Sequence, residues 1–171
     1  MEKRTLKNDI LMLTTIGLLV ALAIIFRSLL AITPVPAIRI AFDFLPIALI
    51  GMKYGSLHAG AAFMMVDLIA HWIFPRGTFF PGFTITAFMA GLSYGFFLHK
   101  KPTSVLGAVT AATIVVVGIQ WGIDTLWLSI IQEVPYTTLF VTRAVRTAIM
   151  LPLQIASILI VAQVAKRAKL I

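Results

Sequence analysis

Five charged residues interrupt long apolar stretches of this sequence. Arg27 follows seventeen consecutive uncharged residues, and Asp67 and Asp124 are each flanked by apolar neighbours. Arg143 and Arg146 lie three residues apart in a further apolar stretch. At the centre of a membrane helix such a residue costs about 2.5–3.5 kcal/mol, so each should face the protein interior or a water-filled cavity. These side chains are therefore candidates for binding a polar or charged ligand.

Aromatic residues accompany the charges. Trp121, Asp124 and Trp127 recur every three residues, which predicts a slanting stripe along one side of a helix. The carboxylate could accept hydrogen bonds from an amino group and a ring N–H together, while the indoles stack on a flat ring. Trp72 and Phe80 are further candidates for contact with a ring, although an interfacial aromatic belt is the alternative for Trp72.

Acid–base catalysis is a weaker alternative. Asp67 and His71 are spaced to share a helix face, and Asp124 could join them. However, no nucleophile or metal-ligand set accompanies them, cysteine is absent, and no P-loop motif occurs. We therefore expect a binding protein that is not an enzyme and has neither a metal site nor a cofactor.

The composition places these residues in a membrane protein. Hydrophobic residues make up 60% of the 171 residues and charged residues 12%, and the mean hydropathy is +1.03. A soluble domain of this length needs about 25% charged residues to cover its surface. The net charge of +8 is spread between apolar segments, which argues against a nucleic-acid partner and for the lipid bilayer as the surroundings.

Six apolar segments predict an all-α membrane protein with six transmembrane helices in a single domain, residues 1–171. A spanning helix needs about 20 mostly apolar residues, and two of the segments contain a proline, which a membrane helix tolerates. A Pro-rich connection follows the first segment. The predicted spans are residues 9–31, 44–54, 57–74, 83–98, 104–131 and 139–165.

The basic residues set an orientation. With the N-terminus inside, the cytoplasmic segments contain nine of the 14 basic residues, and seven of those nine are lysine. We therefore predict cytoplasmic termini in the cell membrane. The other five are all arginine, which grips carboxylates with two hydrogen bonds. They are Arg27, Arg39, Arg76, Arg143 and Arg146.

These five arginines outnumber the acidic residues that could reach the same half of the protein. Those residues are Asp43, Asp67, Asp124 and Glu133. One alternative is a static buried ion pair between Asp124 and either Arg143 or Arg146. The excess of cations instead favours an outer half that binds an anionic ligand.

Small residues spaced four apart predict close contacts between helices. Ala87, Gly91 and Gly95 repeat this spacing twice, and we expect them to pack within the chain. Gly17 and Ala21 form one such pair on the first span. Docking onto a membrane subunit of a partner is another option for that pair.

The segment pattern and three motifs resemble the S-components of energy-coupling factor (ECF) vitamin transporters, and more specifically their folate-specific members. The motifs are the run Phe80-Pro-Gly-Phe-Thr-Ile-Thr-Ala-Phe-Met-Ala-Gly-Leu-Ser-Tyr-Gly95, the run Asp124-Thr-Leu-Trp-Leu-Ser-Ile130, and Arg143-x-x-Arg146 followed by Met150-Leu-Pro152. The resemblance covers most of the chain from Arg39 onward.

The resemblance implies a six-helix fold with a high-affinity site near the outer face, closed over by loops. It implies a folate ligand, a transmembrane coupling protein and two cytoplasmic ATPases as partners, and a docking role for Gly17 and Ala21. On this hypothesis the glutamate tail meets Arg39 and Arg76, and residues 32–42 and 75–82 act as lids.

The remaining candidates divide by chemistry on the same hypothesis. Either Asp67 or Asp124 binds the pterin edge. Anionic or carbonyl groups contact Arg27, Arg143 and Arg146, and the ring faces contact Trp72, Phe80, Trp121 and Trp127. An S-component for another small molecule, such as pantothenate or a queuine precursor, is the main alternative, and an intramembrane enzyme is a distant one.

Overall fold

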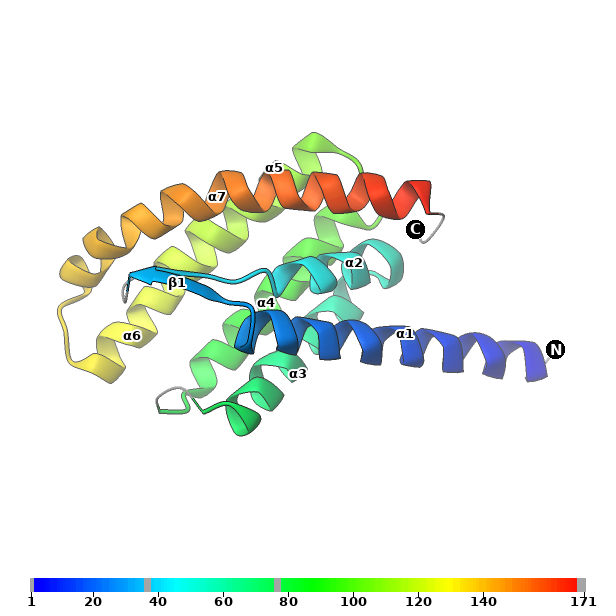
Figure 1. Cartoon of the computed structure of the whole chain (residues 1–171), viewed down its shortest axis with the longest axis horizontal. Coiled ribbons are helices and arrows are strands. Elements are labelled where there is room, and N and C mark those ends of the chain that lie inside the picture. Colours follow the sequence, from blue (N-terminus) through cyan, green and yellow to red (C-terminus); the bar gives the residue numbers. More distant parts are fainter. Residues whose placement is uncertain (1, 36–37, 76–77, 169–171) are drawn as a thin grey trace.

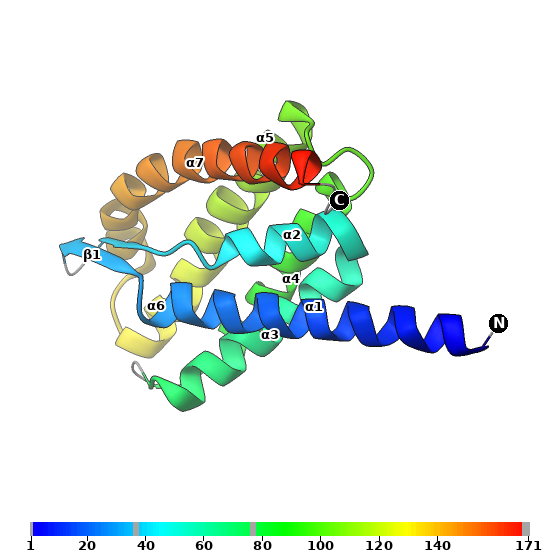
Figure 2. The same cartoon turned by 45° about the vertical axis from the view of Figure 1, so that its right-hand side comes forward.

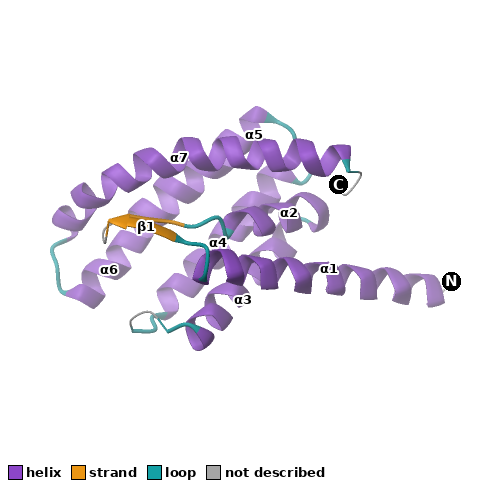
Figure 3. Ribbon diagram, viewed as in Figure 1, coloured by secondary structure: helices purple, strands orange, loops and turns teal. Residues whose placement is uncertain are grey.

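The structure, a computed structural model, describes residues 2–35, 38–75 and 78–168. These residues form a bundle of helices and one β-hairpin (Figures 1 and 3). The elements are α1 (Glu2–Ser28), β1 (Ile32–Val35), β2 (Ile38–Ile40), α2 (Phe44–Tyr54), α3 (Ser56–Ile73), α4 (Pro81–Leu98), α5 (Val105–Thr113), the π-helix η1 (Ile114–Ile123), α6 (Asp124–Gln132) and α7 (Tyr136–Arg167).

The described part of the chain contains five helical stretches long and apolar enough to cross a membrane. They are Asn8–Ser28, Ser56–Ile73, Pro81–Leu98, Val105–Gln132 and Tyr136–Arg167. The sixth helix, α2, has 11 residues and rises only about 16 Å, roughly half the hydrocarbon thickness. The chain is therefore a multi-pass, all-helical membrane protein in which one short helix is enclosed by longer ones.

Both ends of the chain lie at the same end of the bundle, and the β-hairpin lies toward the opposite end (Figures 1 and 2). The N-terminal part of α1 extends beyond the other helices (Figure 1). On this helix Gly17 and Ala21 are exposed, and a Cβ added at Gly17 would have no other atom within 4 Å. The small-residue pair on α1 is thus not used in packing among the described residues.

The segment expected to be a Pro-rich connection contains a short antiparallel hairpin instead. In β1–β2, Ile32 pairs with Ile40 and Val35 with Ile38. Most residues of the two strands are β-branched, and such side chains favour extended backbone. Pro34 is compatible with this hairpin because a two-stranded sheet consists only of edge strands.

The fifth apolar segment also departs from a single regular helix. It passes from α5 through the wider η1 to α6 without a break. A π-helix bonds each amide to the fifth preceding carbonyl, is rare in proteins and often lies at functional sites. The last segment continues as one helix, α7, through Pro152.

Glycines bring α3 and α4 together at the end of the bundle that holds the termini. A Cβ at Gly91 would overlap the carbonyl of Ala59 and lie 2.7 Å from Cα of Gly60. A Cβ at Gly95 would overlap the backbone of Ser56. We predicted that the small residues of α4 pack within the chain, and this is confirmed. Their contacts fix how α3 and α4 run side by side.

We expect Gly91→Ala to lower the stability of the protein by about 1–3 kcal/mol, because a methyl group there forces two backbones apart. Thermal unfolding of the purified protein in detergent measures the change. Gly17→Ala is the matched control, because its new methyl group enters open space. Equal unfolding temperatures for the two variants would contradict the packing described for α3 and α4.

Candidate functional site

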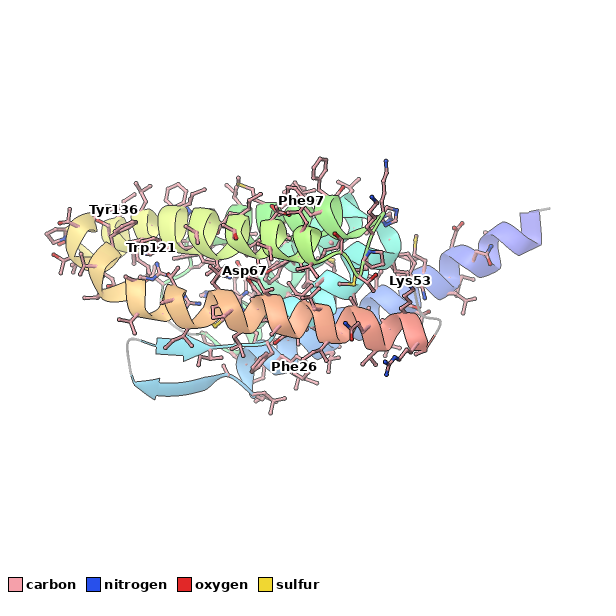
Figure 4. All side chains as sticks on the ribbon, turned by 90° about the horizontal axis from the view of Figure 1, so that it is seen from above. Phe26, Lys53, Asp67, Phe97, Trp121 and Tyr136 are labelled. Carbon is pink, nitrogen blue, oxygen red and sulfur yellow. The ribbon has the colours of Figure 1, made fainter. Side chains whose placement is uncertain are left out.

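Two neighbouring cavities lie where α1, α3, α4 and η1 approach each other, toward the hairpin end. The first, which we call the Asp124 cavity, has a volume of about 150 Å³. The second, the His71 cavity, has a volume of about 140 Å³. Both are lined by Arg27, Asp67 and Phe83. Figure 4 shows Asp67 among the helices, between Tyr136 at one end of the bundle and Lys53 toward the other.

Arg27 is the central cation of this region. At the end of α1, its guanidinium forms an ion pair with Asp67 on α3 and a second, at 3.5 Å, with Asp43 just before α2. Thr84 Oγ1 on α4 donates a hydrogen bond of 2.8 Å to the other carboxylate oxygen of Asp67. Both oxygens of Asp67 are thus engaged by the protein, which ties α1, α3 and α4 together.

Asp124 is less fully engaged. Its Oδ1 accepts a hydrogen bond of 2.7 Å from Thr86 Oγ1, and the residue lines the Asp124 cavity together with Gln120, Arg146 and Met150. Gln120 in η1 and Asp124 at the start of α6 both line this cavity, and Arg146 lines it from α7. The lining thus includes a carboxylate, a carboxamide and a guanidinium.

Arg143 contacts Thr125 and not Asp124, the partner considered from the sequence. Its Nη1 donates a hydrogen bond of 2.8 Å to Thr125 Oγ1, and Thr125 is fully buried. Over residues 2–35, 38–75 and 78–168, neither Arg143 nor Arg146 comes within ion-pair distance of Asp124. The static ion pair considered as an alternative is therefore not formed in this structure.

The His71 cavity is lined by aromatic and hydroxyl side chains in addition to the shared charges. Ser28, Thr78, His71, Phe79 and Phe80 contribute to its wall. His71 lies against Phe79, with ring centroids 5.2 Å apart. The cavity therefore offers charged and hydroxyl groups beside aromatic rings.

Two predicted tryptophans pack within the protein near these cavities. Trp121 stacks on Phe140 at 4.1 Å and donates a hydrogen bond of 2.9 Å to the carbonyl of the same residue. The ring centroids of Trp127 and Phe80 lie 5.3 Å apart, and Gly82 allows this approach because a Cβ there would lie 2.5 Å from the Phe80 ring and 2.8 Å from that of Trp127. The Nε1 of Trp127 is buried and has no partner among the described residues.

The structure does not bring every predicted site residue to the cavities. The Trp72 side chain is 79% exposed, so it faces away from them and fits the interfacial belt instead. Arg39 lies in β2, but its side chain is outside the described part, as is Arg76 entirely. Arg27, Asp67, Asp124 and Arg146 do line the Asp124 cavity, and Phe80 lines the other.

Several residues of the site were not predicted from the sequence. Thr84 and Thr86 hold the two carboxylates, Gln120 lines the Asp124 cavity, and Phe83 lies between the two cavities. Gln120 could have been noticed as an uncharged polar residue in an apolar segment, one helical turn before Asp124. The two threonines lie in the motif run that starts at Phe80, but hydroxyls are common in membrane helices and carry little signal by themselves.

The side chains that line these cavities offer hydrogen-bonding and charged groups to a ligand. No group of three or more potential ligands among the histidines, aspartates and glutamates of the described residues could hold a metal ion. Hydrogen-bond acceptors and donors stand on one wall, with aromatic rings a short distance away. A planar heterocycle that carries donors on its edge would fit this surface.

The family model described as "ECF transporter, substrate-specific component" matches residues 11–163. This chain belongs to that family. It is a membrane-embedded substrate-specific component, or S-component, of an ECF transporter, and the predicted helical S-component fold is confirmed. The matched residues extend from α1 into α7, so the family assignment applies to the whole bundle.

The relatives that match this chain have more specific descriptions than the family model. The folate transporter FolT of Clostridium novyi is 40% identical over 135 residues, which are 79% of this chain and 78% of the relative. FolT of Leuconostoc mesenteroides is 30% identical over 156 residues, 87% and 83% of the two chains. A crystal structure of FolT bound with folic acid superposes with a TM-score of 0.78 at 32% identity, covering 85% of this chain and 89% of the other.

We expect Arg27→Met to destabilise this S-component by about 3–5 kcal/mol in the absence of ligand, because the substitution leaves buried Asp67 without its cation. The double variant Arg27→Met/Asp67→Asn should recover part of the loss. Thermal unfolding in detergent at neutral pH measures both. A double variant less stable than the single one would show that the ion pair is not the main role of Arg27.

Proposed function

We propose that this S-component binds folate at the two cavities and delivers it to an ECF-type uptake transporter. The observation that carries the proposal is the 40% identity to a folate transporter over most of both chains. The likeness to FolT bound with folic acid supports it independently, because it concerns the arrangement of helices around the site.

The charge pattern of the site supports a particular role for each aspartate. Folate carries a pteridine ring whose edge offers hydrogen-bond donors, and a glutamate tail that is doubly negative at neutral pH. Asp67 is already bound by Arg27 and Thr84, whereas Asp124 accepts one hydrogen bond from Thr86. Asp124 therefore binds the pteridine edge, and Asp67 positions Arg27.

The arginines and aromatic rings complete the proposed site. Arg146 lines the Asp124 cavity and Arg143 lies one turn away on α7, so both serve carbonyl or anionic groups of the ligand. Phe80 and Trp127 form an aromatic wall near the His71 cavity, and Phe83 lies where a ligand passes between the two cavities. Arg39 and Arg76 remain proposed contacts of the glutamate tail, and residues 32–42 and 75–82 proposed lids.

The proposed orientation places the cavities toward the outside. Both termini lie at one end of the bundle, and the lysine-rich segments belong to that end (Figures 1 and 4). The positive-inside rule assigns that end to the cytoplasm. The partners are a transmembrane coupling protein and two cytoplasmic ATPases, and the exposed residues Gly17 and Ala21 on α1 supply the docking contact.

Binding should be visible in tryptophan fluorescence. We expect micromolar folic acid to quench the purified protein, and Trp127→Phe to remove most of the quenching, because Trp127 packs on Phe80 beside the His71 cavity. Trp72→Phe is the matched control and should keep it, since Trp72 is exposed and lines neither cavity. Quenching by pantothenate in place of folic acid would move the assignment to another substrate of the family.

Docking should depend on the small face of α1. Gly17→Leu/Ala21→Leu should reduce co-purification with the ATPase pair at least tenfold, because leucine prevents a close approach of helices. Folic acid binding by the isolated variant should stay at the wild-type level. Gly118→Leu/Ala148→Leu, which enlarges two exposed small residues on η1 and α7, is the control. Full assembly of the α1 variant would remove this face from the proposed interface.

A further inference from the structure

One wall of the Asp124 cavity carries two polar side chains four residues apart. Gln120 lies in η1 and Asp124 begins α6, and both line the cavity. Because both side chains line the same cavity, a ring that enters it can contact the carboxamide and the carboxylate together.

The hydrogen bonds of these two groups are incomplete. Thr86 occupies Oδ1 of Asp124, and no described residue donates to Oδ2. The Gln120 carboxamide, which is half-buried, makes no hydrogen bond with any residue in the described part of the chain. Both groups line the cavity and neither is among the buried polar atoms of the described residues that lack a partner, so they are accessible to a ligand that enters it.

The chemistry of a pteridine matches this pair of groups. In folic acid a 2-amino group and N3–H are adjacent donors, and the oxygen at position 4 follows them as an acceptor. A carboxylate accepts from the two donors, and a neighbouring carboxamide N–H donates to the oxygen. Neither group alone distinguishes a 4-oxo ring from a 4-amino ring as well as the two together.

We propose that Gln120 forms a hydrogen bond with the substituent at position 4 of the pteridine ring, while Asp124 accepts hydrogen bonds from the 2-amino group and N3–H. This inference rests on the proposed function and adds a specificity-determining residue to it. Gln120 serves a 4-oxo ring by donating from Nε2, and a rotated carboxamide can accept from a 4-amino group through Oε1. Glutamate, which has the same shape, can only accept when ionised.

The proposal makes Gln120→Glu a test with an internal reference. The ligands are folic acid and aminopterin, which differ at position 4 and share the same tail. In the variant the carboxylate faces the oxygen of folic acid but still accepts from the 4-amino group of aminopterin. We expect the ratio of the dissociation constants, folic acid over aminopterin, to rise at least tenfold. Any general effect of the new charge or of altered folding cancels in this ratio.

Gln163→Glu is the matched control, because it makes the same change on an exposed site of α7 and should leave the ratio at the wild-type value. A ratio within twofold of wild type for Gln120→Glu would overturn the proposal. Failure of the wild-type protein to bind folic acid would instead contradict the proposed function, so the two failures are distinguishable.

Gln120→Met gives a second measurement in case the glutamate variant does not fold. It keeps the length of the side chain and removes its hydrogen-bonding groups. We expect folic acid to bind about tenfold more weakly while the unliganded variant unfolds at the wild-type temperature. Wild-type affinity in Gln120→Met would overturn the role assigned to this residue.

Discussion

Arg27 lies where the end of α1, the second half of α3 and the segment before α2 converge, and its guanidinium pairs with Asp67 and Asp43. Thr84 closes the other side of Asp67 from α4. A charge in an apolar bundle must be neutralised by a partner, so these helices can approach only in an arrangement that joins the cation to its two carboxylates. Both cavities are built around that junction.

The two ends of the bundle are held by different interactions. At the end near the termini, α3 and α4 meet through glycine and alanine, whose small size lets backbones touch and gain dispersion energy. At the hairpin end, ion pairs and threonine hydroxyls link the helices, and two cavities remain between them. Close packing at one end thus provides the rigid support that an open, polar site at the other end requires.

The part of the Asp124 cavity that η1 and α6 form depends on the local geometry of this helical segment. The π-helix η1 widens the turn before Asp124 and ends where α6 resumes a regular path. Gln120 and Asp124 share the cavity on this account, while Trp121 is directed toward α7 and stacks on Phe140. Neighbouring residues in this segment therefore differ in their surroundings: Gln120 and Asp124 line a cavity, and Trp121 joins two helices.

The amino-acid sequence by itself determined the membrane environment, the number and order of the apolar segments and the main charged residues of the site. These follow from hydropathy and from the cost of charge in lipid, which are local properties. The sequence could not show that Arg27 forms ion pairs with Asp67 and Asp43, or that Trp72 faces outward. Both depend on how separate helices cross. Only the tertiary structure decided which of the two aspartates keeps a carboxylate oxygen available, since Thr84 and Arg27 reach Asp67 from other helices.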